Sequence, residues 1–289
     1  MRENGQYQHQ ILINIANFVV ALNTNDTDVA HRIQGRYHEF LGTDEIPRVS
    51  VTLKIVPGAL YIKPRPGPWI IESSYTAERL TYCSYQERGE VDLVSGQGYL
   101  EMDPTAQVDN FLRTVYAWLC VQNNALLLHS AGVIRDGFGY VFFGPSGAGK
   151  TTTSYLASRT AHVVSDDLVI IQCDENGCTL YGVPFKGELS EAPRANQQAP
   201  LKGLFRLRQD TAHYLESVPH VKAVADLVAA SPFIVRERKL SAQLMSVCSK
   251  IARNVPVQQL HFKRDDGFWK VIDEQHSGKV PQTASPDGR

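Results

Sequence analysis

The chain contains 289 residues, of which 43% are hydrophobic and 20% charged, and its formal net charge is −1. This composition is typical of a globular protein, and the nearly balanced charge excludes a global basic field of the kind that drives nonspecific nucleic-acid binding. The most apolar stretch, residues 11–22, is interrupted by Asn14 and Asn17 and is shorter than the ~18 apolar residues that span a bilayer. It also lacks the basic start and cleavage site of a signal peptide. We therefore expect a cytoplasmic protein with no nucleic-acid and no membrane partner.

The first part of the chain combines short strands with one helix. Strands are predicted at residues 11–22, at residues 48–56 and in several short runs within 57–103. Residues 26–41 have a four-residue apolar spacing that predicts a helix, with Asp26 or Thr27 as its cap. These features predict an antiparallel-rich α+β amino-terminal portion over residues 1–125, which either forms its own domain or adds strands to the following core.

The rest of the chain alternates between strands and helices. Strands are predicted at residues 125–134, 139–144, 162–173, 200–209 and 255–265. Helices are predicted at residues 106–124, 150–159, 221–230 and 239–252. A polar loop is predicted over 186–200. We expect an α/β catalytic domain over residues 126–274 and a disordered polar tail over 275–289.

A glycine-rich segment near the middle of the chain has the form of a phosphate-binding loop. Residues 144–151 read GPSGAGKT, which fits G-x-x-x-x-G-K-[ST], between an apolar strand pattern and helix-forming residues. Glycines let successive backbone N–H groups turn toward an anion at the positive end of a helix. Lys150 is expected to reach the β- and γ-phosphates, and the Thr151 hydroxyl to reach Mg²⁺. The residues expected to bind nucleotide are Gly144, Pro145, Ser146, Gly147, Ala148, Gly149, Lys150, Thr151 and Thr152. The alternative is a glycine-rich turn whose site has decayed.

Two adjacent acids, Asp166 and Asp167, follow this loop after one short predicted helix. We expect their strand to lie beside the strand that precedes the loop, in a single right-handed crossover, so that both carboxylates lie near Lys150 and Thr151. Adjacent strand residues point to opposite faces, so the two acids should have different roles. One can bind Mg²⁺ while the other acts as general base toward an acceptor hydroxyl. The alternative is a surface turn with two solvated acids.

The chain has five cysteines, at positions 83, 120, 173, 178 and 248. Cys173 and Cys178 flank the turn sequence DENG and are expected to face each other across a hairpin. No second close Cys/His pair supports a zinc site. Free thiols are therefore favoured over a redox or metal role.

Residues 128–171 resemble the catalytic domain of bacterial HPr kinase/phosphorylase. The resemblance is carried by LHSAGVI with His129, by GPSGAGKTT and by VVSDDLV, in this order and at this close spacing. It implies a phosphoenolpyruvate-carboxykinase-like P-loop fold with a mixed, twisted sheet. It also implies ATP or another purine nucleotide and Mg²⁺ as cofactors, a peptide, protein or small-molecule hydroxyl acceptor as partner, and assembly into a homo-oligomer. The amino-terminal part does not resemble the regulatory domain of typical HPr kinases, so an acceptor other than HPr is expected.

The same resemblance implies roles for individual residues. The catalytic residues would be Asp166 as general base, His129 near the transferring phosphate, and Lys150. The metal ligands would be Thr151, Asp167 and Glu188. The distribution of roles between the two aspartates remains open.

Several candidate residues also have ordinary structural interpretations. His129 ends an apolar run and could be a core histidine, and Glu188 could be a solvated loop residue. The same holds for Arg194, which could otherwise brace a phosphate. Arg206 and Arg208 share one face of a predicted strand and could extend an anionic site, although a solvated edge is favoured.

The leading functional hypothesis is a Mg²⁺-dependent ATP-binding kinase that transfers the γ-phosphoryl group to a hydroxyl, such as a serine on a peptide or protein. Two alternatives stay open. One is a phosphorylase or phosphohydrolase that uses the same site, and the other is a non-catalytic nucleotide-binding sensor or assembly factor.

Overall fold

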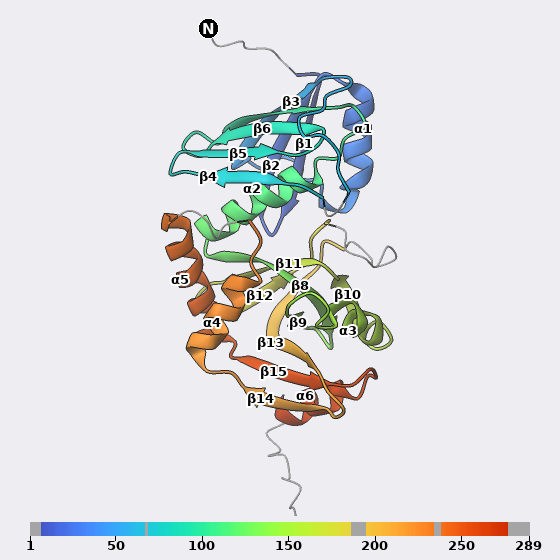
Figure 1. The fold of residues 1–289 in the computed structure, drawn as a ribbon, viewed down its shortest axis with the longest axis vertical. Coiled ribbons are helices and arrows are strands. Elements are labelled where there is room, and N and C mark those ends of the chain that lie inside the picture. The colour runs from blue at the N-terminus through green and yellow to red at the C-terminus, as the bar shows by residue number, and fades with distance from the viewer. Residues whose placement is uncertain (1–6, 67–68, 186–194, 234–237, 277–289) are drawn as a thin grey trace, which may run out of the picture.

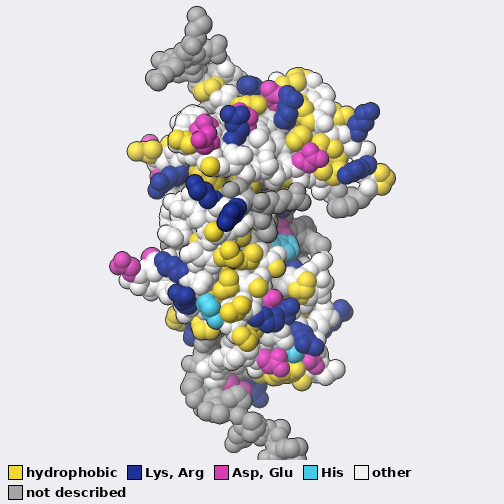
Figure 2. Space-filling model, turned by 60° about the vertical axis from the view of Figure 1, so that its left-hand side comes forward, with side chains coloured by type: hydrophobic (Ala, Val, Ile, Leu, Met, Phe, Trp, Pro, Cys, Tyr) yellow, Lys and Arg dark blue, Asp and Glu magenta, His cyan; other side chains and the backbone are white. Residues whose placement is uncertain are grey.

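The computed structural model describes residues 7–66, 69–185, 195–233 and 238–276 (Figure 1). The chain forms two β-sheets with helices packed on and between them, so the fold is mixed α/β. Positive and negative side chains are interspersed over the face shown in Figure 2, in agreement with the net charge of −1. None of the helices in the described part of the chain combines the length and apolarity needed to cross a bilayer.

The first sheet has seven strands in the order β1-β2-β3-β7-β6-β5-β4. Their bounds are His9–Ile15 (β1), Phe18–Thr24 (β2), Val49–Ile55 (β3), Glu72–Tyr75 (β4), Arg79–Cys83 (β5), Glu87–Asp92 (β6) and Gln97–Met102 (β7). The pairs β2–β3 and β3–β7 are parallel, and the other pairs are antiparallel. The predicted single strand over residues 11–22 is wrong, because Ala16 and Asn17 adopt positive φ angles of 52° and 64° and turn the chain into a β1–β2 hairpin.

Two helices accompany this sheet. Helix α1 (Thr27–Arg36) packs on β1 and β2, and its amino end is capped by Asp26, whose carboxylate accepts a hydrogen bond of 2.9 Å from Val29 N. A 3₁₀ turn, η1 (His38–Phe40), follows it. Helix α2 (Asp109–Gln122) lies between the two sheets and contacts β5 of the first and β8 of the second (Figure 1).

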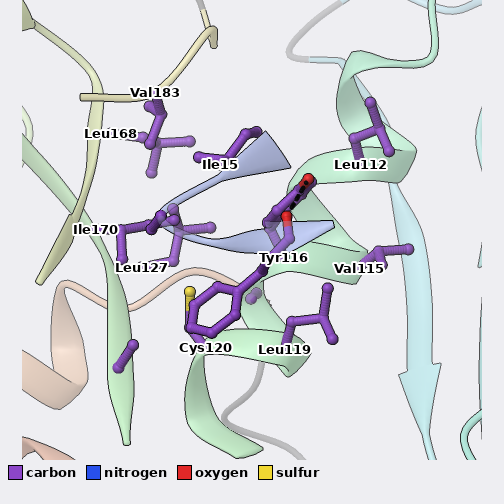
Figure 3. Packing of buried hydrophobic residues seen from close by; sticks show 14 of the residues in the cluster. Ile15, Leu112, Val115, Tyr116, Leu119, Cys120, Leu127, Leu168, Ile170 and Val183 are labelled. Carbon is purple, nitrogen blue, oxygen red and sulfur yellow. Dashed lines mark hydrogen bonds between the residues drawn. The ribbon is translucent and has the colours of Figure 1, made fainter. Parts of the chain in front are cut away.

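One buried hydrophobic cluster continues from the first sheet through α2 into the second sheet. Figure 3 shows Ile15 of the first sheet close to Tyr116 of α2 and to Leu127 and Leu168 of the second. The Tyr116 hydroxyl bonds to the carbonyl oxygens of Ile13 (2.8 Å) and Phe18 (3.0 Å), which fixes the β1–β2 hairpin on α2. The two parts therefore share a core, and the expected domain limits stay a prediction.

The second sheet contains the remaining strands. Their bounds are Ala125–Arg135 (β8), Phe138–Phe143 (β9), His162–Ser165 (β10), Leu168–Cys173 (β11), Cys178–Tyr181 (β12), Gln198–Gln209 (β13), Tyr214–Ser217 (β14) and Val257–Phe262 (β15). The first half of β8 pairs with β11, and its second half pairs with β9 and β10. Likewise β13 pairs first with β12 and then with β9 and β15. The path β8-β11-β12-β13-β9 thus returns to β8 and closes this part of the sheet.

The helices of the second half are α3 (Lys150–Ala157), α4 (His220–Ala229), α5 (Arg238–Asn254) and α6 (Phe268–His276). α3 packs on β8, β9 and β10, while α4 and α5 pack on each other beside the second sheet (Figure 1). β14 and α6 were not predicted. α6 extends to residue 276, so the expected disordered tail begins too early at 275, and the rest of that tail lies outside the described residues.

Two further expectations are wrong in detail. The predicted strand 162–173 is two strands, because β10 ends at Ser165 and β11 starts at Leu168. β10 also does not lie beside β9, since β8 runs between them, antiparallel to both.

The cysteine pair in the second sheet also differs from the prediction. Cys173 and Cys178 face each other on β11 and β12, as expected, but they form a disulfide rather than free thiols. The hairpin places Cys173 directly opposite Cys178, with their Cα atoms 4.0 Å apart.

Candidate functional site

The glycine-rich loop connects β9 to α3, as the motif requires. Gly147 and Gly149 have φ angles of 78° and 108°, in the left-handed region that favours glycine. A Cβ on Gly149 would also lie 2.6 Å from the ring of Phe262. These two glycines let the chain turn sharply into α3, so that the amides of its first turn, which have no partner within the helix, face the loop.

Lys150 is the first residue of α3 and is buried, with 9% of its surface exposed. Its ammonium donates to the carbonyl oxygens of Gly144 (3.0 Å) and Pro145 (3.4 Å), so it lies over the start of the loop. Thr151 and Thr152 follow it on the half-exposed side of the first helical turn. The loop thus combines a cation, hydroxyl groups and helix-terminal amides, which together suit an anionic ligand.

The two acids occupy the irregular link between β10 and β11. The Ser165 hydroxyl accepts long hydrogen bonds from the N–H groups of Asp167 (3.4 Å) and Leu168 (3.3 Å), and Ser130 N donates to the Asp167 carbonyl (2.9 Å). Asp166 is buried, with 6% of its surface exposed. The acids therefore belong to a fixed bend within the sheet, and the alternative of a surface turn with two solvated acids is wrong.

Asp167 is held by the side chains of Arg113 and His129. Its carboxylate lies 3.2 Å from Nη2 of Arg113 and 3.1 Å from Nδ1 of His129. Arg113 comes from α2, and its guanidinium also lies over the ring of Phe185, 5.5 Å from the centroid. Because a carboxylate only accepts hydrogen bonds, Nδ1 of a neutral His129 would carry the proton and Nε2 would be the acceptor.

A cavity of about 520 Å³ brings these groups together. Its lining consists of His129, Ser146, Gly147, Gly149, Lys150, Thr151, Thr152, Asp166, Asp167, Gln209 and Arg264. Six of the nine residues predicted from the loop and both predicted acids thus line one cavity. Gly144 and Pro145 lie on the other side of the loop, and Ala148 packs partly buried behind it.

Gln209 and Arg264 were missed by the sequence reasoning, although a signal exists. β9, β13 and β15 are mutually parallel, and β10 points the same way because both it and β9 are antiparallel to β8. Ligands of such sheets bind outside the carboxyl ends of the strands. The loop follows β9, Gln209 ends β13, and Arg264 lies two residues after β15, so a polar residue at or just past the carboxyl end of a strand is the usable signal. Gln209 Nε2 also donates to Gly147 O (2.8 Å), which ties β13 to the loop.

Charged residues behind Gln209 fix the end of β13. Asp210 lies 2.9 Å from Nδ1 of His261 and accepts a hydrogen bond of 3.0 Å from the Tyr214 hydroxyl. The hydrogen bond from His261 is the main reason that the pKa of Asp210 falls to about 2. The carboxylate therefore stays ionised at neutral pH and anchors the strand end from which Gln209 reaches the loop.

A second cavity, of about 480 Å³, adjoins the first and shares His129 and Ser146 with it. Its remaining lining consists of Phe143, Gly144, Pro145, Arg206, Asp226, Ala229, Ala230, Ser231 and Pro232. Arg206 forms an ion pair of 3.1 Å with Asp226 in this cavity, so it is not a solvated edge residue, whereas Arg208 is exposed and lines neither cavity.

Two predicted residues cannot be placed. Glu188 and Arg194 lie outside the described residues. Within the part of the chain that the structure describes, no group of three or more His, Cys, Asp or Glu side chains could hold a metal ion by itself.

The family model of the SynChlorMet cassette protein ScmC matches residues 104–276. The chain belongs to this family. No curated protein matches the chain. Among solved structures, it is similar to the Hpr(Ser) kinase/phosphatase from Coxiella burnetii, with 9% identity and a TM-score of 0.31 over 52% of this chain and 96% of that chain. This likeness is distant and carries no argument about activity.

Proposed function

We propose that this protein is a Mg²⁺-dependent kinase of the HPr-kinase-like type, on a phosphoenolpyruvate-carboxykinase-like P-loop fold, which transfers the γ-phosphoryl group of ATP to a hydroxyl acceptor. One observation carries the proposal. A glycine-rich loop with Lys150 and Thr151 shares a cavity of about 520 Å³ with the adjacent acids Asp166 and Asp167. Positioning and charge neutralisation are what phosphoryl transfer requires of a protein.

The donor groups of the cavity suit Mg²⁺, which takes few protein ligands, better than a metal ion whose ligands all come from the protein. Mg²⁺ is usually held by one or two carboxylates together with substrate phosphates and water. Thr151 and Asp166 supply a hydroxyl and a carboxylate beside the loop. Bound Mg²⁺ would neutralise negative charge on the β- and γ-phosphates.

The contacts of Asp167 favour a different distribution of roles from the one expected from the sequence. Its carboxylate is already engaged by Arg113 and His129, which makes it a poor metal ligand but a good orienting group. We therefore assign the metal contact to Asp166, and to Asp167 the task of holding His129 in the tautomer that leaves Nε2 as acceptor.

The transfer then follows a simple course. The acceptor oxygen forms a bond to the γ-phosphorus while the bond from that phosphorus to the β–γ bridging oxygen breaks, and ADP leaves with the electron pair. The acceptor proton passes to Nε2 of His129. Lys150 and Arg264, which line the cavity from different elements, would stabilise charge on the phosphates.

The first experiment is Mg²⁺-dependent ATP binding by wild type and by Lys150→Met, followed by transfer from γ-labelled ATP. A lost charge-assisted hydrogen bond of ~1.5–3 kcal/mol weakens binding about 10- to 100-fold. Lys202→Met is the matched control, because Lys202 is exposed on β13 and lines neither cavity. If Lys150→Met binds ATP like wild type, the loop is not the nucleotide site. Nucleotide binding without any turnover would favour the non-catalytic sensor. Removal of the phosphoryl group from a phosphorylated acceptor, with consumption of inorganic phosphate, would favour the phosphorylase.

A further inference from the structure

We propose that His261, a buried histidine on β15, is a positioning residue for the phosphate-binding loop and that it acts through the contact of its Nδ1 atom with Asp210. Only 3% of the surface of His261 is exposed, and the residue lines neither of the two cavities at the loop. It would therefore influence a bound nucleotide only through other residues. This inference rests on the proposed nucleotide site and adds a residue that gives the site its shape.

Two strand ends support the glycine-rich loop. At the end of β13, Gln209 Nε2 donates to the carbonyl oxygen of Gly147 (2.8 Å). At the end of β15, the ring of Phe262 packs against Gly149 so closely that a Cβ there would lie 2.6 Å from it. Gly147 and Gly149 are the glycines whose positive φ angles turn the loop into α3. The position of these two strand ends therefore determines where the loop amides point.

His261 joins the same two strand ends through its side chain. Its Nδ1 atom lies 2.9 Å from the carboxylate of Asp210. Asp210 directly follows Gln209 in the chain, and Phe262 directly follows His261. The Asp210 N–H also donates to the Phe262 carbonyl (2.8 Å), so a backbone bond and a side-chain bond connect the strand ends. Both residues that support the loop are thus next to the pair that His261 forms.

The contact between His261 and Asp210 has a fixed geometry. Because a carboxylate only accepts hydrogen bonds, the proton of this contact lies on Nδ1. The bond from His261 is the main reason that the pKa of Asp210 is about 2, so its acceptor stays ionised. Tyr214 holds both partners, since its hydroxyl donates to Asp210 (3.0 Å) and its ring stacks on the imidazole with the centroids 4.0 Å apart. The imidazole and the carboxylate are therefore held in one arrangement.

The other ring nitrogen of His261 has partners that do not touch the loop. Nε2 lies 2.9 Å from the carboxylate of Glu216 and 2.8 Å from the side-chain amide of Gln259. Glu216 belongs to β14, at the end of the strand order, and 53% of its side chain is exposed. Neither Glu216 nor Gln259 lines a cavity at the loop. The two nitrogens of one ring therefore have separable roles, and only Nδ1 leads to the nucleotide site.

The test compares two variants that each keep one arm of the ring. In His261→Asn, the side-chain amide replaces Nδ1 and can donate to Asp210, whereas in His261→Gln the amide replaces Nε2 and the Asp210 contact is lost. Binding of Mg²⁺–ATP is measured by titration. We expect His261→Asn to bind within about threefold of wild type and His261→Gln to bind about tenfold or more weakly, the scale seen when a residue that orients a binding group is replaced. Equal losses in the two variants, or a larger loss in His261→Asn, overturn the proposal.

A double-mutant cycle tests the route through Gln209. We expect Gln209→Ala to weaken Mg²⁺–ATP binding, because it removes the bond to Gly147. Adding His261→Gln to Gln209→Ala should then cost less affinity than His261→Gln costs in wild type, since residues that act through one contact are not additive. Fully additive losses, or no loss in Gln209→Ala, overturn this route.

The partner side chains provide a second matched pair, which keeps the test valid if a His261 variant does not fold. Asp210→Ala should lose affinity for Mg²⁺–ATP as His261→Gln does, and Glu216→Ala should bind like wild type; the reverse order overturns the proposal. The control is His38→Gln, because 68% of the His38 side chain is exposed on η1, and it should bind like wild type. Urea unfolding shows which variants are folded. If wild type itself binds no Mg²⁺–ATP, the proposed nucleotide site fails, whereas normal binding by wild type with equal losses in the two His261 variants rejects only the role of His261.

Discussion

Replacing Asp166 and Asp167 separately tests whether the first contacts the metal and the second orients His129. In Asp167→Asn, the side chain keeps its shape but loses the charge that faces His129 at 3.1 Å and Arg113 at 3.2 Å. In Asp166→Asn, the buried carboxylate beside the loop becomes an amide, which is a weaker ligand for Mg²⁺. Because the two acids have different neighbours, the two variants should fail in different ways.

The magnitudes follow from those neighbours. Without the Asp167 charge, His129 loses the group that fixes its tautomer, and general base catalysis contributes ~10²–10⁴-fold. We expect kcat to fall by about this range while Mg²⁺–ATP affinity stays nearly constant. Loss of the partly buried ion pair with Arg113 should also lower the free energy of unfolding by ~1–2 kcal/mol. Asp166→Asn should instead weaken Mg²⁺-dependent ATP binding by about tenfold or more.

The assay combines titration with a fluorescent ATP analogue, with and without Mg²⁺, and single-turnover transfer from labelled ATP. Asp136→Asn is the matched control, because Asp136 lies in the β8–β9 turn with 82% of its side chain exposed. The assignment of roles is refuted if Asp167→Asn abolishes Mg²⁺-dependent binding while Asp166→Asn preserves it. Unfolding curves for all variants show whether a loss of activity is a loss of fold.

Three further predictions concern stability and ligand affinity. Burial raises the pKa of Glu87 from 4.5 to about 7, although a hydrogen bond from Tyr82 partly opposes the shift. At ~1.4 kcal/mol per pKa unit, the ionised Glu87 carboxylate lowers the free energy of unfolding by about 3 kcal/mol at high pH. The stability that protonated Glu87 contributes is fully present below pH 4.5 and is lost as pH rises through 7. In urea unfolding, Glu87→Gln should therefore have a higher free energy of unfolding than wild type above pH 7 and the same value at pH 4.5. Gly149→Ala should lose ~1–3 kcal/mol of stability by urea unfolding, because its φ of 108° is unfavourable for alanine and its Cβ would meet Phe262; a neutral effect contradicts the loop geometry. Arg264→Ala should weaken ATP binding by about tenfold or more in direct titration without changing AMP binding, and equal losses for both nucleotides would place Arg264 away from the terminal phosphates.

Much of the local structure around the loop could be predicted from the sequence, because it depends on neighbouring residues. The strand–loop–helix arrangement follows from an apolar run, a fixed glycine spacing and helix formers in immediate succession. The hairpin between Cys173 and Cys178 follows from the turn sequence between them, although their bonding does not. The β1–β2 turn was missed because Ala16 and Asn17 interrupt an otherwise apolar run without a glycine.

The paths of the long strands could not be predicted, because they depend on pairings far apart in the chain. β8 exchanges its partner from β11 to β9 and β10 near residue 130, and no pattern in its eleven residues marks this change. That exchange puts β8 between β9 and β10, so the expected adjacent crossover is replaced by one that spans a strand. The acids still reach the cavity, because β9 and β10 keep the same direction and end at the same edge.

Arg113 shows the deepest limit of the sequence reasoning. It lies within a helix whose apolar spacing explains the residues around it, and nothing in that pattern distinguishes it from an ordinary surface arginine. Its meaning arises only when α2 packs between the two sheets and brings its guanidinium 3.2 Å from Asp167. Because α2 belongs to the amino-terminal portion predicted from the sequence, the ion pair between Arg113 and Asp167 depends on packing of both parts of the chain. Asp167 in turn contacts His129. Mutations in the shared core around Tyr116 should therefore change catalysis as well as stability, whereas a P-loop domain cut at residue 125 would lack Arg113 altogether.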